Sequence, residues 1–151
     1  MNFKPELIEK ILRGEKTQTR RLVGERDFCL PGLHLAEIKS VVIEDGYRDN
    51  RHRIKWQVGQ TYAICPGRGK QAVGRIQITA IRRERLQEIT SDDCWAEGVR
   101  LGGSMIISYR ILFEDLWQSL YAGQPGKQWD DNPWVWALTF ELAEAIEAVQ
   151  R

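Results

Sequence analysis

The spacing of apolar residues changes abruptly at Gly14, and this change constrains the fold more than any other feature of the sequence. Before the glycine, apolar residues recur at helical spacing at Leu7, Ile8, Ile11 and Leu12. A proline suits the first turn of this segment and the glycine suits its end, so the pattern predicts a helix over residues 4–13. Over residues 17–22 the period becomes two, which places Thr19 and Arg21 on one side of an extended segment. A helix that leads directly into a strand is therefore expected.

Most of the remaining chain has the pattern of short strands. The candidates are bounded by turn signals and cover residues 37–43, 53–58, 60–65, 73–82 and 134–142. Helical patterns occur over residues 90–97 and 107–121, and a short tail helix is expected from Leu142. Because strands and helices do not alternate regularly, the six strands favour a barrel over a parallel sheet. The prediction is an α+β fold, with a β-barrel of about six strands and flanking α-helices.

The length of the chain bounds its organisation. A chain of 151 residues suffices for one hydrophobic core, and we expect a single domain over residues 1–151. No apolar run approaches the roughly 20 residues of a membrane span, and charges near residue 1 interrupt any signal-like stretch. The expectation is a cytoplasmic protein that does not enter a membrane.

Three cysteines stand at wide spacings, at Cys29, Cys65 and Cys94, with only two histidines in the chain. This pattern indicates reduced thiols with a structural role, although a catalytic Cys–His pair stays open. We expect no metal and no cofactor.

Charge is divided unevenly along the chain. Residues 1–85 carry 18 Lys and Arg against 10 Asp and Glu, whereas residues 86–151 carry 4 against 11. The two parts therefore have net charges of +8 and −7, within a total of +1. This asymmetry favours a positive face that meets a polyanion. The alternative is that the two parts interleave in space and neutralise one another.

Two local features add weaker signals. The loop over residues 66–70, Pro-Gly-Arg-Gly-Lys, lacks the spacing of a nucleotide-triphosphate loop and is either a hairpin turn or a backbone nest for phosphate. The helix predicted after Thr90 ends at Glu97, followed by Gly98. A carboxylate at that end opposes the helix dipole, and broken local rules of this kind point weakly to function.

The segment from Gly14 to Arg21, Gly-Glu-Lys-Thr-Gln-Thr-Arg-Arg, resembles the GxKxxExR signature of the ASCH family. Gly14, Lys16 and Arg21 match, whereas Thr19 stands where the family has glutamate. A threonine here is similar to the small bacterial ASCH enzymes that hydrolyse the acetyl amide of N4-acetylcytidine. Those enzymes use a lysine, a threonine three residues later and a downstream glutamate, for which Glu97 is the matching position. The resemblance implies a PUA-like barrel that acts on RNA or on a modified nucleobase.

The resemblance also implies roles for these residues. Lys16 would act as a base and Thr19 as the nucleophile, because a hydroxyl needs a neighbouring base to remove its proton. Glu97 would hold Lys16 or carry the proton to the departing amine. Arg21 and Arg20 are candidate substrate-binding residues, and Arg21 would stabilise either an oxyanion or the polar edge of the substrate. The alternative is an exposed basic strand with a surface salt bridge.

A tryptophan-rich segment follows the predicted turn at Asp130–Pro133. Its sequence, Asn-Pro-Trp-Val-Trp, resembles a segment of one branch of ASCH proteins. Most such tryptophans pack in a core, but Trp134 or Trp129 would also offer a stacking surface for an unpaired base. We place Trp134 among the candidate substrate-binding residues.

Two functions of different classes remain open at this point. The first is an amidohydrolase that cleaves an N4-acylated cytidine to cytidine and a carboxylate. The second is a noncatalytic module that binds RNA or a modified base, and nuclease activity is a weaker third possibility. The segments over residues 28–51 and 101–126 exceed the minimal amidohydrolases and are expected to narrow the cleft or alter its specificity.

Overall fold

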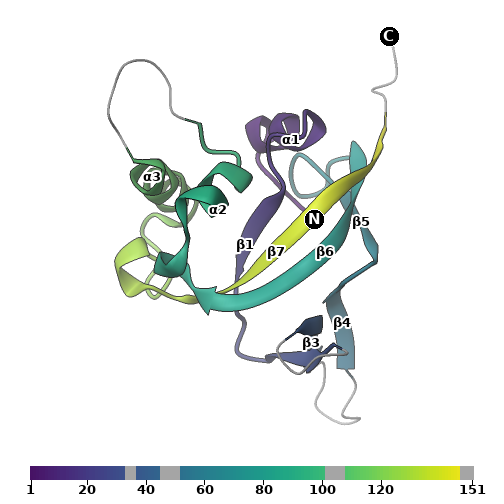
Figure 1. Cartoon of the computed structure of the whole chain (residues 1–151), viewed down its shortest axis with the longest axis horizontal. Coiled ribbons are helices and arrows are strands. Elements are labelled where there is room, and N and C mark those ends of the chain that lie inside the picture. The colour runs from purple at the N-terminus through teal and green to yellow at the C-terminus, as the bar shows by residue number, and fades with distance from the viewer. Residues whose placement is uncertain (33–36, 45–51, 101–107, 147–151) are drawn as a thin grey trace.

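The computed structural model describes residues 1–32, 37–44, 52–100 and 108–146. Its helices are α1 (Pro5–Leu12), α2 (Ser91–Ala96) and α3 (Tyr109–Tyr121), with 3-10 turns η1 (Leu86–Glu88) and η2 (Trp129–Asp131). Its strands are β1 (Gln18–Leu22), β2 (Asp27–Pro31), β3 (Ile38–Glu44), β4 (His52–Gln57), β5 (Thr61–Ile64), β6 (Gly74–Arg85) and β7 (Trp134–Ala145). Figure 1 shows the long β6–β7 pair running through the middle of the molecule. None of the described helices is long and apolar enough to cross a membrane.

The strands form two antiparallel sheets, with orders β1-β7-β6-β5 and β2-β3-β4. The mixed helix and strand content agrees with the predicted fold class, but the prediction of a closed barrel is wrong. Among the described residues, β1 and β5 end the first sheet and β2 and β4 end the second. The described strands form no continuous ladder between the two sheets, which instead pack together where Val41 on β3 meets Ile78 and Ile81 on β6. The indole of Trp136 on β7 also donates a 3.0 Å hydrogen bond to Asp27 on β2.

Helix α1, the strands predicted after it and α3 lie close to their expected positions, but two local predictions failed. Strand β2 was missed because its sequence, Asp-Phe-Cys-Leu-Pro, lacks regular alternation and ends in a proline at a register shift. The tail helix expected from Leu142 is instead the end of β7, where Ala145 pairs with Gly74. Pairing with β6 therefore determines the conformation of this segment.

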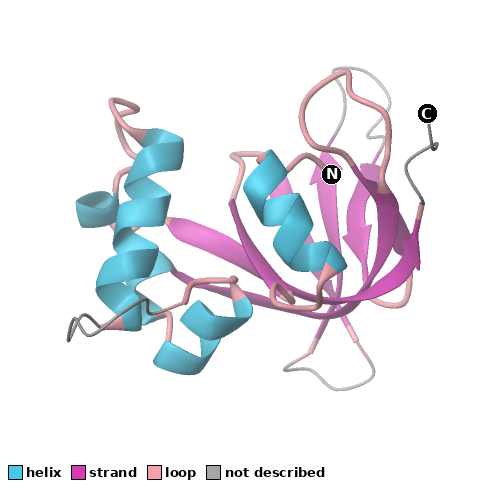
Figure 2. Ribbon diagram, turned by 90° about the horizontal axis from the view of Figure 1, so that it is seen from above, coloured by secondary structure: helices cyan, strands magenta, loops and turns pink. Residues whose placement is uncertain are grey.

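Strand β7 lies at the centre of the core, between β1 and β6. Four successive residues, Val135 to Leu138, are buried, because elements pack against both of its faces. Helix α1 packs against β5, β6 and β7 around Ile11 and Phe140, whereas α2 and α3 pack around the start of β7. Figure 2 shows α1 over the sheet and the α2–α3 pair beside it at one end.

The junction between α1 and β1 places the signature residues next to α2. Gly14 ends the helix with a φ of 76°, a left-handed conformation that glycine adopts without steric cost. The chain then crosses to α2, where the Thr17 N–H donates to the Ala96 carbonyl at 2.7 Å. This crossing brings β1 alongside Glu97, although the two are far apart in sequence.

Candidate functional site

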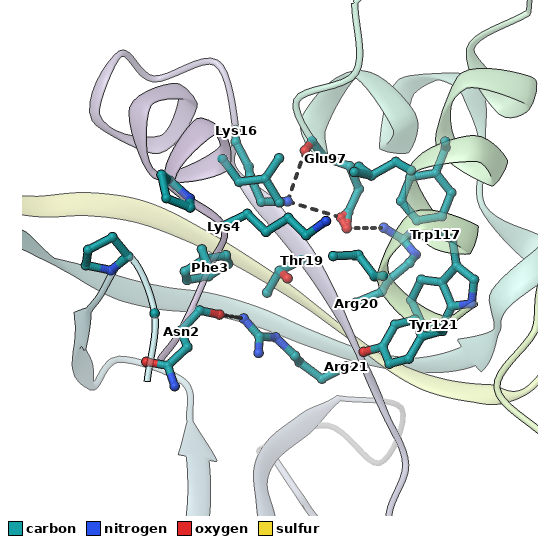
Figure 3. Close-up of a pocket in the computed structure, with 17 residues that line it drawn as sticks. Asn2, Phe3, Lys4, Lys16, Thr19, Arg20, Arg21, Glu97, Trp117 and Tyr121 are labelled. Carbon is teal, nitrogen blue, oxygen red and sulfur yellow. Dashed lines mark hydrogen bonds and ion pairs between the residues drawn. The ribbon is translucent and has the colours of Figure 1, made fainter. Parts of the chain in front are cut away.

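A pocket of about 380 Å³ opens between α1, β1, α3 and the end of α2 (Figure 3). Five of the six predicted site residues line it: Lys16, Thr19, Arg20, Arg21 and Glu97. Trp134 does not. It lines a separate cavity of about 330 Å³ with Arg83.

Lys16 and Glu97 form a buried ion pair at the back of the pocket. Each residue is 3% exposed, and Lys16 Nζ lies 3.4 Å from Glu97 Oε2. The same ammonium group donates to the Glu97 carbonyl at 2.9 Å and to the Gln18 carbonyl at 2.7 Å. Burial lowers the pKa of Lys16 below its usual value, although the charge and hydrogen bond of Glu97 oppose the shift. The pair is therefore a fixed charge couple in which the lysine has acceptors for all three of its protons.

Gly98 allows this close approach of Glu97 to Lys16. Its φ is 97°, and a Cβ atom at this position would lie 3.3 Å from Lys16 Cβ and 3.2 Å from Lys10 Cδ. The glycine thus meets a conformational and a steric requirement at once.

We expect Gly98→Ala to lower the free energy of unfolding by at least about 1 kcal/mol, because alanine is strained in the left-handed conformation. Chemical denaturation would measure the loss. Gly123→Ala is the matched control, because Gly123 has a similar φ of 75° but a Cβ atom there would meet no other atom within 4 Å. Equal losses in the two variants would show that the contact with Lys16 does not matter.

Arg20 is held by acidic groups behind the pocket. Its guanidinium contacts Glu84 at 2.6 Å and Asp93 at 3.2 Å, and lies 4.0 Å from Glu97 Oε1. It also donates to the side chain of Gln18 at 3.0 Å. Glu84, Asp93 and Gln18 hold the guanidinium in place. The guanidinium in turn lies close to the Glu97 carboxylate, so Arg20 can help to orient Glu97.

Acidic residues from the second part of the chain thus neutralise basic residues from the first. Asp93 contacts both Arg20 and Arg82 at 3.2 Å, and Glu97 pairs with Lys16. Burial alone raises the pKa of Asp93, but Arg20, Thr90 and Arg82 outweigh burial and lower it. In this cluster the two parts of the chain therefore neutralise one another, which is the alternative to a single positive face.

Thr19 points into the pocket from β1. The residue is 5% exposed, and within the described part of the chain its hydroxyl makes no hydrogen bond. The hydroxyl is also not joined to Lys16, as a preformed nucleophile and base would be. Catalytic hydrogen bonds are often long in the absence of substrate, so this geometry is compatible with either function.

Arg21 and Tyr121 form the opposite wall. Arg21 lies against Phe3, with Cζ 4.8 Å from the ring centroid, and donates from Nη2 to the Asn2 carbonyl at 2.9 Å. Burial lowers the pKa of the Arg21 guanidinium below its ordinary value and raises the pKa of the Tyr121 phenol. Tyr121 stacks on Trp117 with ring centroids 4.4 Å apart.

The sequence did not predict the contributions of Lys4 and Asn2 to the pocket. Lys4 reaches from the start of α1 into the pocket (Figure 3). Helix α3 supplies an apolar wall that includes Trp117 and Tyr121, so the described part of the extra segment over residues 101–126 lines the pocket. No described residue of the 28–51 segment lines it. The sequence pattern predicts the apolar face of α3, but it does not show which surface that face lies against.

The tryptophan-rich segment divides between core and surface. Trp129 and Trp136 are buried, at 6% and 1% exposed, as packing predicts. Trp134 is 38% exposed, and Arg83 and Arg85 lie over its ring at 4.5 and 4.4 Å. A stacking role for Trp134 would therefore act outside the pocket.

No protein-family model and no curated protein matches this chain. Among solved structures, it is similar to a crystal structure of a protein of family DUF984 from Enterococcus faecalis V583, with a TM-score of 0.56 and 15% identity. That match covers 97% of this chain and 75% of the other. A second similar structure is an ASCH domain from Lactobacillus crispatus JV V101, with a TM-score of 0.48, 17% identity, and coverage of 92% and 71%. This chain thus shares its overall fold with the Enterococcus faecalis protein.

Proposed function

We propose that this chain is an ASCH-domain amidohydrolase that cleaves an N4-acylated cytosine base to cytosine and a carboxylate. The observation that carries the proposal is the Thr19 hydroxyl, which lines the pocket beside the buried Lys16–Glu97 pair and has no partner among the described residues. A hydroxyl without an internal role, next to groups that can exchange a proton, suits nucleophilic catalysis.

The proposed reaction has two steps. The Thr19 oxygen attacks the acyl carbonyl carbon while its proton passes to the Lys16–Glu97 pair. Collapse of the tetrahedral intermediate breaks the bond between the carbonyl carbon and N4, and N4 takes the proton as the base departs. Water then hydrolyses the threonine ester, which releases the carboxylate and restores the hydroxyl.

The observed hydrogen bonds define how the pair would have to work. Lys16 donates to two carbonyls and one carboxylate, which is the pattern of the ammonium form. It can accept a proton from Thr19 only after passing one to Glu97. Burial lowers the pKa of Lys16 and so favours its neutral form, which is the form that can accept a proton.

The pocket has the size and surface for a single base. Its volume of about 380 Å³ is near the lower end of small-ligand sites, roughly 300 to 1,000 Å³. Phe3, Trp117 and Tyr121 supply aromatic surface, and polar groups gather on the β1 side. A flat ring with polar edges fits this distribution.

Incubation of the purified protein with N4-acetylcytidine, followed by chromatography, tests the proposal. We expect conversion to cytidine and acetate in equal amounts. N4-methylcytidine, which has no acyl carbonyl, is the matched control and should be unchanged. Absence of turnover on every acylated cytosine tested would reject the hydrolase.

A noncatalytic module is the second candidate, and one observation favours it. Lys16 makes no hydrogen bond to Thr19 among the described contacts, and its own donors already have acceptors. In such a module the same groups would read the edge of a base. Tight binding of a modified nucleoside without turnover would support this alternative.

A further inference from the structure

Two cations on the wall of the pocket lack a carboxylate partner. The lining includes the basic residues Lys4, Lys16, Arg20 and Arg21, with Glu97 as the acid among them. Lys16 is paired with Glu97, and Arg20 is paired with Glu84 and Asp93 from behind. Within the described residues, Lys4 and Arg21 make no salt bridge. The pocket therefore keeps an excess of positive charge that would attract an anionic ligand.

Arg21 presents unused donors at this place. One nitrogen, Nη2, donates to the Asn2 carbonyl, but Nε is buried without an acceptor and Nη1 has none among the described residues. Burying a donor without an acceptor is unfavourable in the empty protein. Because Phe3 covers one face of the guanidinium, a ligand would meet its edge, where planar donors suit the oxygens of a phosphate.

The loop singled out in the sequence reaches the same pocket. Pro66 and Gly67 line it, and the turn is closed by a hydrogen bond from the Lys70 N–H to the Gly67 carbonyl at 3.2 Å. In the described structure, the N–H groups of Gly67, Arg68 and Gly69 donate to no acceptor. Gly67 has no side chain to block access to them. The loop therefore brings to the pocket Gly67, whose N–H has no acceptor among the described residues, and it adds no carboxylate to the lining.

We propose that the ligand of this pocket carries a phosphate, which Arg21 and Lys4 bind while its base lies against Thr19 and Glu97. The phosphate is either the monoester of a nucleotide or a phosphodiester of RNA. A monoester carries about 1.5 to 2 negative charges near neutral pH, which matches the two unpaired cations. This inference rests on the proposed function for the identity of the base, but the preference for phosphate is measurable without turnover.

Equilibrium titration of the full chain with cytidine, 5′-CMP, 3′-CMP and the dinucleotide CpC tests the proposal. We expect at least one phosphorylated ligand to bind at least about tenfold more tightly than cytidine at low salt, with an advantage that shrinks as salt is added. A preference for 5′-CMP or 3′-CMP identifies the monoester, and a preference for CpC alone identifies the phosphodiester. Equal affinity of cytidine and all three phosphorylated ligands would overturn the proposal.

Variants locate the phosphate. Lys4→Gln and Arg21→Gln should each reduce the ratio of the affinity for the phosphorylated ligand to the affinity for cytidine about tenfold. Arg13→Gln is the matched control, because Arg13 is exposed, pairs with Glu15 at 3.3 Å and lies outside the pocket. If Arg21→Gln fails to fold, the exposed Lys4 decides the question. A preference that survives in Lys4→Gln and in any folded Arg21→Gln protein would contradict the assignment.

These measurements separate the two proposals. A preference for phosphate without turnover of any acylated cytosine would leave the phosphate site standing and reject the hydrolase. Turnover of N4-acetylcytidine without a preference for phosphate would support the hydrolase and reject the phosphate site.

Discussion

Replacing Thr19 with alanine is expected to lower the turnover of N4-acetylcytidine by at least about 10³-fold, because the variant has no oxygen to form the acyl intermediate. The affinity for cytidine should change by less than about tenfold, which is the effect of one neutral hydrogen bond. Single-turnover kinetics and equilibrium titration would measure the two quantities separately. Loss of turnover with retained affinity is the signature of a group that acts in the reaction.

Two further variants sharpen this test. Thr19→Ser keeps the hydroxyl and should retain much of the activity, whereas Thr17→Ala removes a neighbouring threonine that does not line the pocket and should have little effect. Mass spectrometry of wild-type protein quenched during turnover should find the acyl group on Thr19. Undiminished activity in Thr19→Ala would reject the covalent mechanism and leave water as the nucleophile.

The parts of the fold that follow from local sequence could be predicted. The passage from α1 to β1 at Gly14 is encoded in one short segment by periodicity and by one glycine, and it lies where expected. A barrel closes only if edge strands that are far apart in the sequence form hydrogen bonds with each other. No local sequence pattern predicts this pairing. Strand β2 likewise depends on pairing with β3 and on no periodicity of its own.

The site divides in the same way. Lys16 and Thr19 are three residues apart on one segment, so a family signature could point to both. Glu97 was predicted from the family resemblance and from the unfavourable position of its carboxylate at the C-terminal end of a helix. The structure now gives a physical reason for that place, because Lys16 compensates the carboxylate there. Lys4 and Tyr121 reach the pocket only through tertiary packing, which the chain pattern does not reveal.

The Lys16–Glu97 pair leads to the largest expected effect on stability. Glu97→Ala removes the carboxylate from a lysine that is 3% exposed, and breaking a buried pair in this way costs about 3 to 5 kcal/mol. Urea denaturation near neutral pH would measure the loss. The double variant Lys16→Met with Glu97→Leu leaves no unpaired charge at these two positions, so it should be more stable than Glu97→Ala. Glu15→Ala is a control, because Glu15 belongs to an exposed pair with Arg13.

The loss in Glu97→Ala should also depend on pH, with a sign that the buried lysine determines. Glu97 opposes the effect of burial on the pKa of Lys16, so its removal lowers that pKa further. The unfolded chain then binds a proton at Lys16 over a pH range in which the folded chain does not, and stability rises with pH across that range. The deficit relative to wild type should be greatest below the Lys16 pKa of the folded variant and should shrink until the pH passes the Lys16 pKa of the folded wild type, which itself lies below the ordinary lysine value of 10.5. A deficit that stays constant from neutral to alkaline pH would show that the cost comes from lost packing, with no unpaired ammonium group in the folded variant.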